Sequence, residues 1–410
     1  MTVVSSVVPN DAHAVLSAEV LAGLDRETGL VRGLPNAAFT SEEFLALERE
    51  TLFKRSWVFA GRLSQVPKRG DVEPIEVAGR KVFLARGADD RVRVFYNVCP
   101  HRGARLVIEP QRETPVLTCP YHAWSYDLDG NLKGRPHYHG PDRHDRGGNG
   151  NGRAGDRDAV CLFEVRSAVW HDWVFVNLDG AAQDFDDYMK PIRAHFDGWD
   201  FSQFRYAHYE QFEFRCNWKL AVENGADFYH NFKVHSSTSD VAFVTAESDP
   251  FLGDGIHLSA VAMLSGPDRM FSSVSLGALP ILSGLSQEKM SMLPVAVVFP
   301  NSFIVARPGI LELLYFEPIG PDGTVMHNWF YFVGDGADAP EHESSRQLVY
   351  ADLENTNKED EGICLRLQEG RTCDAYDGGR LSPYWDSGTA HFHRQLADAI
   401  LGRGAFARPA

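Results

Sequence analysis

Hydrophobic residues recur at helical spacing only after an opening stretch with no sustained period. Residues 1–40 are therefore expected to form a loosely ordered N-terminal arm. Thr40-Ser-Glu-Glu43 then matches a capping box, in which the Thr40 side chain accepts from the backbone N–H of Glu43. Apolar residues at helical spacing follow as far as Trp57. We expect a helix there, at the start of a first domain at 41–180.

Alternation of polar and apolar residues replaces the helical period after Asp71. Gly79 and the polar stretch 87–90 separate runs that are short enough to be strands of an antiparallel sheet. The strands expected in this small all-β domain are 72–77, 81–85, 92–96, 162–165 and 173–176.

A polar, glycine-rich stretch near 139–158 lacks any apolar period and is expected to be an insertion in the first domain. It contains the spacing G-x-G-x-x-G at Gly150, Gly152 and Gly155. That spacing indicates dinucleotide binding only between a strand and a helix, and here a charged loop precedes it. We therefore interpret it as a loop.

The second domain, at 181–410, mixes helical and strand-like patterns. We expect a helix at 185–196, a helix beyond Asn217, strands at 295–299, 302–306, 311–317 and 327–333, and a long helix at 341–368. The predicted fold class is α+β: a small all-β domain is followed by a domain whose antiparallel sheet is flanked by helices.

The charge and composition of the chain indicate which kinds of molecule it can bind. The chain has 410 residues, 56 acidic against 40 basic side chains, and a net charge of −16. Nucleic acid and anionic membranes both need a basic face and are disfavoured, whereas a protein with a basic patch, such as a reductase, is compatible. The six cysteines share no spacing that would suggest a disulfide framework. Without a basic start or a long apolar run, we expect a cytoplasmic protein.

The first candidate site combines two thiols with two imidazoles. Cys99-Pro-His101 is followed after seventeen residues by Cys119-Pro-Tyr-His122. A [2Fe–2S] cluster can take two cysteines on one iron and two histidines on the other. Structural zinc is the alternative, but zinc fingers usually keep cysteines together and histidines together. The alternating order favours the cluster.

The second candidate site contains Asp227, His230 and His235 on a predicted helix. At about 100° per residue, Asp227 and His230 lie about 60° apart and His230 and His235 about 140° apart. The two histidines can reach one metal only if the helix ends or bulges between them, and Asn231 is a candidate for that break. Two histidines and a carboxylate form the facial triad of Fe(II) oxygenases.

The third ligand is expected from the long late helix. Asp360 shares one face with three apolar residues at helical spacing, so its carboxylate should be buried and should need a cation. Glu359 and Glu361 point elsewhere and are expected to be solvated. Asp360 is therefore the candidate ligand, and a helix-surface charge is the alternative.

These motifs together resemble those of the α subunits of Rieske non-haem iron oxygenases, also called aromatic-ring-hydroxylating dioxygenases. The resemblance covers nearly the whole chain and rests on Cys99-Pro-His-Arg-Gly103, Cys119-Pro-Tyr-His-Ala-Trp124, Asn217-Trp-Lys-Leu220 and Glu223-Asn-Gly-Ala-Asp-Phe-Tyr-His230. It implies that one Rieske [2Fe–2S] cluster is bound by Cys99, His101, Cys119 and His122. It also implies that one mononuclear Fe(II) is bound by His230, His235 and Asp360.

The resemblance gives Asp227 a catalytic role as a bridge. In the family this carboxylate joins the mononuclear site to a Rieske histidine of a neighbouring subunit, which here would be His122 of the neighbour. The working unit implied is a homotrimer, with or without a small β subunit. A separate NAD(P)H-dependent reductase, directly or through a ferredoxin, would supply electrons, because the chain has no nicotinamide or flavin signature of its own.

The substrate is the least constrained part of the prediction. The motif around His230 resembles benzoate and anthranilate dioxygenases and favours an aromatic compound, with or without a carboxylate. The stretch 374–382 with Phe392-His393 is more similar to betaine- and carnitine-type oxygenases, so monooxygenation or N-demethylation of a quaternary amine is the alternative. Arg307 is a candidate partner for a carboxylate, or a member of a surface salt bridge. An electron carrier and a zinc-containing binding protein remain as alternatives from other classes.

Overall fold

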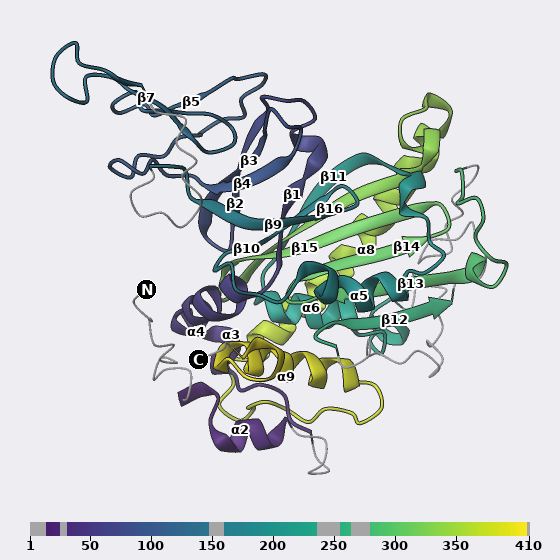
Figure 1. Ribbon diagram of the computed structural model, residues 1–410. Coiled ribbons are helices and arrows are strands. Elements are labelled where there is room, and N and C mark those ends of the chain that lie inside the picture. Colours follow the sequence, from purple (N-terminus) through teal and green to yellow (C-terminus); the bar gives the residue numbers. More distant parts are fainter. Residues whose placement is uncertain (1–13, 25–30, 147–159, 236–254, 264–278, 408–410) are drawn as a thin grey trace. The chain divides into compact units, whose positions relative to one another are not determined.

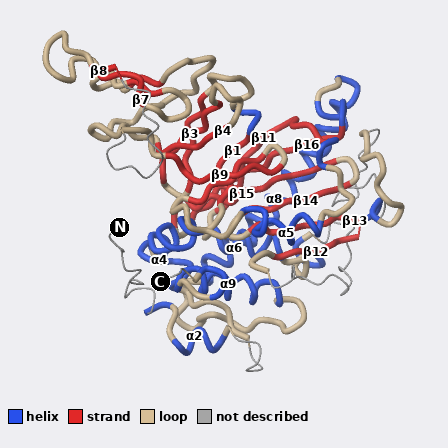
Figure 2. Tube along the Cα trace, viewed as in Figure 1, coloured by secondary structure: helices blue, strands red, loops and turns tan. Residues whose placement is uncertain are grey.

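The computed structural model describes residues 14–24, 31–146, 160–235, 255–263 and 279–407. Contacts divide the chain into two compact units (Figure 1). The smaller unit is Phe53–Ala182, and the larger unit combines Met1–Leu52 with Gln183–Ala410. Both contain antiparallel sheet, and the long helices of the described residues lie in the larger unit (Figure 2). The predicted α+β class is confirmed.

The smaller unit contains two antiparallel sheets. The first has the strand order β1-β10-β9-β4-β3-β2, and the second has the order β5-β6-β7-β8. Their bounds are β1 Val58–Arg62, β2 Val72–Val77, β3 Arg80–Arg86, β4 Val92–Tyr96, β5 Leu117–Thr118, β6 Ser125–Tyr126, β7 Leu132–Arg135, β8 Asp145–Arg146, β9 Glu164–Trp170 and β10 Trp173–Asn177.

Local sequence explains the edge of the first sheet. Pro74 lies in β2, the edge strand, where its missing N–H removes no bond from the sheet interior. The β2–β3 hairpin turns through Ala78 and Gly79, whose φ angles are +49° and +78°. Two consecutive positive φ angles give the turn twist that matches paired strands. This hairpin fixes the register of the sheet that backs the first candidate site.

The larger unit is built on one six-stranded antiparallel sheet of order β11-β16-β15-β14-β13-β12. The strands are β11 Phe204–Phe214, β12 Leu258–Met263, β13 Met292–Val298, β14 Ser302–Arg307, β15 Ile310–Gly320 and β16 Gly323–Val333. The helices are α2 Ala18–Gly23, α3 Ala37–Thr40, α4 Glu42–Glu48, α5 Phe185–His195, α6 Trp218–Ala226, α7 Asn231–Val234, α8 Glu343–Gly370 and α9 Ser387–Leu401. Single turns of 3₁₀ helix occur at Leu63–Gln65, Phe201–Gln203, Lys289–Ser291, Gly334–Ala337, Pro340–His342 and Gly404–Phe406.

Helices α6 and α8 position the second candidate site. They pack against each other, and both contact the sheet, α6 at β15 and β16 and α8 at β11. Helix α8 spans 28 residues, close to the long helix that the sequence predicts (Figure 1). It also contacts the short α7, so a residue in the middle of α8 lies near the segment that follows α6.

The first predicted helix differs from the structure in three ways. Ser41, not Thr40, is the N-cap residue, and its hydroxyl accepts from Phe44 N at 3.1 Å. Helix α4 passes at Glu48 into a π-helical turn, Arg49–Phe53, and helical backbone continues to residue 55, close to the end expected near Trp57. This segment also falls mostly in the larger unit rather than in the domain expected at 41–180, because the buried side chain of Glu48 pairs with Lys219 of α6.

The prediction of a loosely ordered arm at 1–40 is wrong for the described residues 31–40 at its end. Leu34 and Phe39 are buried, and Gly33 N donates to Gly378 O. These contacts tie the segment to the C-terminal part of the larger unit. Of the predicted insertion, 147–159 lies outside the described residues, and β8 belongs to its described part.

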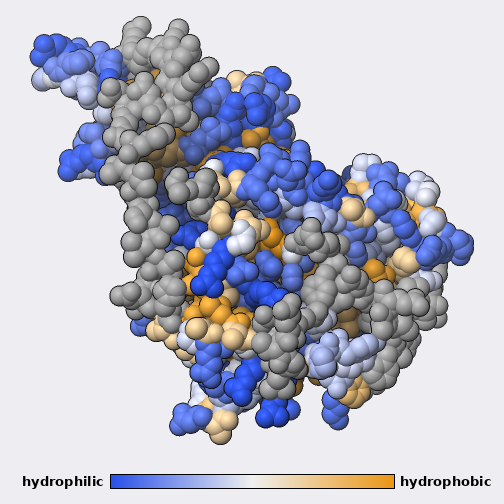
Figure 3. Space-filling view, turned by 60° about the horizontal axis from the view of Figure 1, so that its bottom comes forward, coloured by the Kyte–Doolittle hydropathy of each residue, from blue (hydrophilic) through white to orange (hydrophobic). Residues whose placement is uncertain are grey.

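Hydrophilic residues cover much of the described surface in Figure 3, interrupted by groups of hydrophobic residues. In the described part of the chain, every helix is too short or too polar to cross a membrane.

Candidate metal centres

Two loops of the smaller unit hold the first candidate site, and they share one hydrogen-bond pattern. Cys99 N donates to Ala104 O at 2.8 Å, and Cys119 N donates to Trp124 O at 2.8 Å. Four residues after each cysteine, the N–H returns to the cysteine carbonyl at 3.0 Å. The returning residues, Gly103 and Ala123, both have positive φ, at +77° and +57°. Each loop therefore folds back on its cysteine in the same way.

The four side chains form two pairs instead of one group. The thiols of Cys99 and Cys119 are buried and within interaction distance, and their loops also bring the rings of His101 and His122 to 4.8 Å between centroids. Among the described residues, the ligand atoms of Cys99, His101, Cys119 and His122 do not lie close enough together to bind one ion. The buried Nδ1 of His122 has no hydrogen-bond partner there. Two thiols beside two imidazoles suit two iron atoms better than one zinc ion.

Neighbouring aromatic residues support the loops. Tyr126 is fully buried, and its hydroxyl lies 3.3 Å from Cys99 Sγ. Burial and the contact with Cys99 raise the pKa of Tyr126, so the hydroxyl keeps its proton and can donate to sulfur. Trp124 stacks on the ring of His101 at 4.3 Å with a 4° angle between planes. The site thus receives both a hydrogen bond and a rigid apolar wall.

The motif Asn217-Trp-Lys anchors the start of α6. Asn217 is the N-cap, and its side-chain oxygen accepts from Lys219 N at 3.1 Å. Lys219 Nζ donates to Glu48 Oε1 at 2.7 Å, and Trp218 Nε1 donates to Glu48 Oε2 at 2.9 Å. The two charged groups are fully buried. This motif therefore sets where α6 begins, and so where it ends.

Helix α6 ends before the second candidate site. The prediction that Asp227, His230 and His235 lie on one helix is wrong: α6 stops at Ala226, and Asp227 is extended with φ −100° and ψ 119°. His230 and His235 are the N-cap and C-cap of α7, which has only four residues. The required break lies before Asn231 and lets both imidazoles turn to the same point.

Three ligand atoms converge at that point. His230 Nε2 lies 3.2 Å from His235 Nε2, and Asp360 Oδ1 lies 3.4 Å and 3.1 Å from the two nitrogens. Ligands at right angles around one ion, each about 2.1 Å from it, lie about 3 Å apart. The triangle therefore has the size of one face of an octahedral metal site, with the opposite face left for other ligands.

Two carboxylates fix the orientation of the imidazoles. Asp227 Oδ2 lies 3.3 Å from His230 Nδ1, and Glu359 Oε2 lies 2.7 Å from His235 Nδ1. A carboxylate oxygen can only accept, so each Nδ1 carries the proton and each Nε2 presents a lone pair. The buried Oδ1 of Asp360 faces both lone pairs and makes no conventional hydrogen bond. Three acceptors pointing at one place fit a cation between them.

The pKa values of these groups show the same demand for positive charge. Burial lowers the pKa of His230, but Asp227 and Asp360 outweigh it and raise the value to about 9. Burial raises the pKa of Asp360, while His230 and His235 lower it to about 2. Carboxylates therefore dominate the site electrostatically and favour a positive charge between them.

Glu359 is a site residue that the sequence reasoning missed. It was expected to be solvated because it precedes Asp360 and points about 100° away on the helix. His235 lies on that side of α8, so the two consecutive acidic residues serve different atoms of the same imidazole. Glu361 does point away and pairs with Arg215 at 2.7 Å.

A cavity in the larger unit opens onto the triad. The described residues around it include His230, His235, Asp360 and Asp227. Its walls are mainly apolar and include Phe214, Phe228, Leu293, Val295, Phe303, Val305, Leu314, Phe316 and Met326. Arg307 and Glu312 are the charged residues among the rest of its lining. The arrangement suits a molecule with a mainly apolar body held beside a metal ion.

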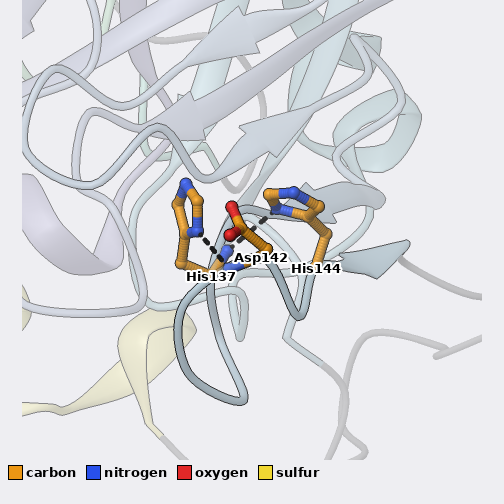
Figure 4. A group of neighbouring side chains, drawn as sticks. All are labelled: His137, Asp142 and His144. Carbon is orange, nitrogen blue, oxygen red and sulfur yellow. Dashed lines mark hydrogen bonds between the residues drawn. The ribbon is translucent and has the colours of Figure 1, made fainter.

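A third group of metal-ligand side chains lies on the β7–β8 connection, in the smaller unit. Figure 4 shows the carboxylate of Asp142 between the rings of His137 and His144. Here the backbone N–H of Asp142 donates to His137 Nδ1 at 3.0 Å, and that of His137 donates to His144 Nδ1 at 3.1 Å. In a neutral ring the proton is then on Nε2, and the one lone pair is already used. We interpret this exposed group as a hydrogen-bonded turn.

Two family models match the chain. Residues 56–141 match the Rieske [2Fe-2S] domain, and residues 201–402 match the catalytic domain of the ring hydroxylating alpha subunit. The first range contains both cysteine–histidine loops, and the second contains the triad.

Similar proteins include complete oxygenase subunits. The oxygenase subunit of carnitine monooxygenase from Escherichia coli (strain K12) is 27% identical over 90% of this chain and 93% of its own length. The large oxygenase component of salicylate 5-hydroxylase from a Ralstonia species is 26% identical over 78% of this chain and 79% of its own. Among solved structures, naphthalene 1,2-dioxygenase from a Rhodococcus species has a TM-score of 0.71 at 19% identity, covering 96% of this chain and 99% of that one.

Proposed function

We propose that the chain, which belongs to the α subunits of the Rieske oxygenases, is the terminal oxygenase of a multicomponent system. Proteins of this family are oxidoreductases that incorporate O₂, and the chain binds a Rieske [2Fe–2S] cluster and a mononuclear iron. Such subunits work with a reductase. The observation that carries the proposal is the facial triangle of His230, His235 and Asp360 at the end of an apolar cavity.

The ligand assignments form the first part of the proposal. Cys99 and Cys119 would hold one cluster iron, and His101 and His122 the other. His230, His235 and Asp360 would hold the mononuclear iron, with Asp227 and Glu359 keeping the imidazole protons on Nδ1. When bound, the cluster supplies single electrons and the mononuclear iron supplies the activation of dioxygen.

Asp227 has a second role in the proposal. Its Oδ1 accepts from Tyr229 N at 2.5 Å and its Oδ2 faces His230, so the carboxylate is held by two partners. Its side chain is 24% exposed, which leaves an edge available to another chain. For the quaternary ammonium Rieske monooxygenase CntA, inter-subunit electron transfer has been described. We propose that Asp227 meets His122 of a neighbouring subunit in a homotrimer.

The substrate is proposed to be a small aromatic compound. The aromatic side chains among the described lining of the cavity are all phenylalanines, which pack against rings but bind cations less strongly than tryptophan does. Monooxygenation of a quaternary ammonium compound is the second candidate, because a carnitine monooxygenase subunit matches nine-tenths of the chain. Both candidates place a carbon atom beside the open face of the triad.

Oxygen consumption with a reductase and NAD(P)H tests this function. We expect substrate-dependent O₂ uptake, with ¹⁸O from labelled dioxygen in a hydroxylated product, from a panel of aromatic acids and methylated amines. His230→Ala should abolish product formation while the cluster spectrum persists. A product that forms equally well with His230→Ala, or an oxygen atom that comes only from water, would contradict the proposal.

A further inference from the structure

The cavity beside the triad contains one buried ion pair. Arg307 ends β14 and Glu312 lies on the adjacent strand β15, where Glu312 is paired with Val305. Arg307 is 3% exposed and Glu312 is 2% exposed. Arg307 Nη1 donates to Glu312 Oε1, and Asn328 Nδ2 donates to Glu312 Oε2 at 3.2 Å. Both oxygens of Glu312 are therefore occupied.

The guanidinium of Arg307 is only partly used by this pair. It has five N–H groups in a planar fork, and one edge of that fork is made by Nε–H and Nη2–H. Within the described residues, the buried Nε of Arg307 has no hydrogen-bond partner. Glu312 binds through Nη1 and so leaves the Nε–Nη2 edge unused. A buried, charged donor without a partner is uncommon in folded proteins, so we infer that a bound molecule supplies the acceptor.

The shape and charge of the free edge identify that acceptor. A guanidinium edge matches a carboxylate, whose two oxygens accept two parallel hydrogen bonds. Glu312, which is itself held by Asn328, keeps the guanidinium in place, so little side-chain freedom is lost when an anion binds. The other walls of the cavity are mainly apolar and include Phe303 and Leu314. A ligand for this cavity therefore needs an apolar body and one anionic end.

We propose that Arg307 binds the carboxylate of the substrate, so that the enzyme acts on small organic carboxylates and discriminates against neutral analogues. This inference rests on the proposed function, because it takes the cavity as the substrate site. Arg307 is then the specificity-determining residue, and Glu312 is a positioning residue that acts through it.

Two matched pairs of probes test the inference by calorimetric binding to the anaerobic holoenzyme. Benzoate differs from benzamide, and glycine betaine from choline, chiefly in the carboxylate. We expect at least tenfold tighter binding of the carboxylate in at least one pair. Arg307→Gln should reduce that preference to about twofold or less while the neutral member binds as before. Arg205→Gln, at an exposed ion pair with Asp338 on the same sheet, should keep the preference.

A double variant distinguishes loss of the anion site from loss of folding. Arg307→Gln alone leaves Glu312 buried without its cation, whereas Arg307→Gln with Glu312→Gln removes both charges and should lose the same preference. The inference is overturned if wild-type protein shows no preference in either pair, or binds none of the four probes. It is also overturned if the preference survives in both variants. Preference without O₂-dependent product would instead reject the proposed function and leave Arg307 as an anion site.

Discussion

Two pairs of histidines in this chain differ in which ring nitrogen carries the proton: it is Nδ1 in His230 and His235, and Nε2 in His137 and His144. At His230 and His235 the Nδ1 atoms face carboxylates, so the Nε2 lone pairs converge with Asp360 Oδ1. At His137 and His144 the Nδ1 atoms accept from backbone N–H groups, so the lone pairs are consumed locally. Identical residue types at similar spacing therefore have opposite capacities for metal.

Metal affinity at the triad should depend on pH. His230 has a pKa raised to about 9, so below that value a proton must leave before Nε2 can bind metal. We expect the affinity of iron-depleted protein for Co²⁺ to increase about tenfold per pH unit between pH 6.5 and 8.5 and to level off above about 9. Spectrophotometric titration measures it. Asp227→Asn should lower the pH at which the plateau begins, and a flat profile in wild-type protein would contradict the assignment.

Tyr126 should tune the cluster. When Cys99 binds iron as a thiolate, only the tyrosine can donate, and a hydrogen bond to sulfur favours the reduced cluster. Tyr126→Phe should therefore lower the reduction potential by about 40 mV, which corresponds to about 1 kcal/mol. Redox titration followed by absorbance measures this shift. Tyr138→Phe is the control, because that exposed ring packs on Trp124; equal potentials for the two variants would reject the role.

At the scale of elements, the start of α6 is fixed by buried charge. Glu48→Gln leaves Lys219 buried without its counter-ion and should cost about 3–5 kcal/mol in the free energy of unfolding. Adding Lys219→Met removes the unpaired charge and should recover most of that loss. The amide oxygen that Glu48→Gln introduces can still accept from Trp218 Nε1. Urea denaturation measures each value.

The exposed pair Lys358–Glu354 provides the matched control for that prediction. Both side chains are more than half exposed, so Lys358→Met should cost less than about 1 kcal/mol. Equal losses for Glu48→Gln and for the double variant would show that the unpaired charge of Lys219 is not the cause of the destabilisation.

Elements with a clear hydrophobic period were predictable from sequence. The β2 strand, α5 and the long α8 were found close to their observed bounds. Strand β11 was missed because only its end residues, Phe204 and Phe214, are fully buried, and charged or polar residues between them obscure the alternation. Period alone detects a strand only when one face is continuously buried.

The candidate sites show the same limit. The ligand types and spacing around Cys99, Cys119 and His230 were legible in the sequence because those residues lie on short local loops. Glu359 was not, because its role depends on His235 packing against one side of α8 across 124 positions. The end of α6 before Asp227 was also hidden, since no proline marks it and Gly225 lies within the last turn of the helix rather than after it.

At the scale of the whole molecule, the chain separates electron storage from oxygen chemistry. The Rieske loops belong to the smaller unit, and the triad with its cavity belongs to the larger one. The proposed ligands of each site all belong to one unit. Loss of either metal centre should therefore leave the other one formed, although turnover requires both.

Iron content and spectra of two variants test this separation most directly. Wild-type holoenzyme should contain about three irons per chain, two in the cluster and one in the triad. Asp360→Ala should lose one iron and keep the visible spectrum of the cluster, and Cys119→Ser should lose the cluster spectrum and keep one iron. Zinc in place of iron, or loss of the cluster spectrum in Asp360→Ala protein that remains folded, would contradict the account.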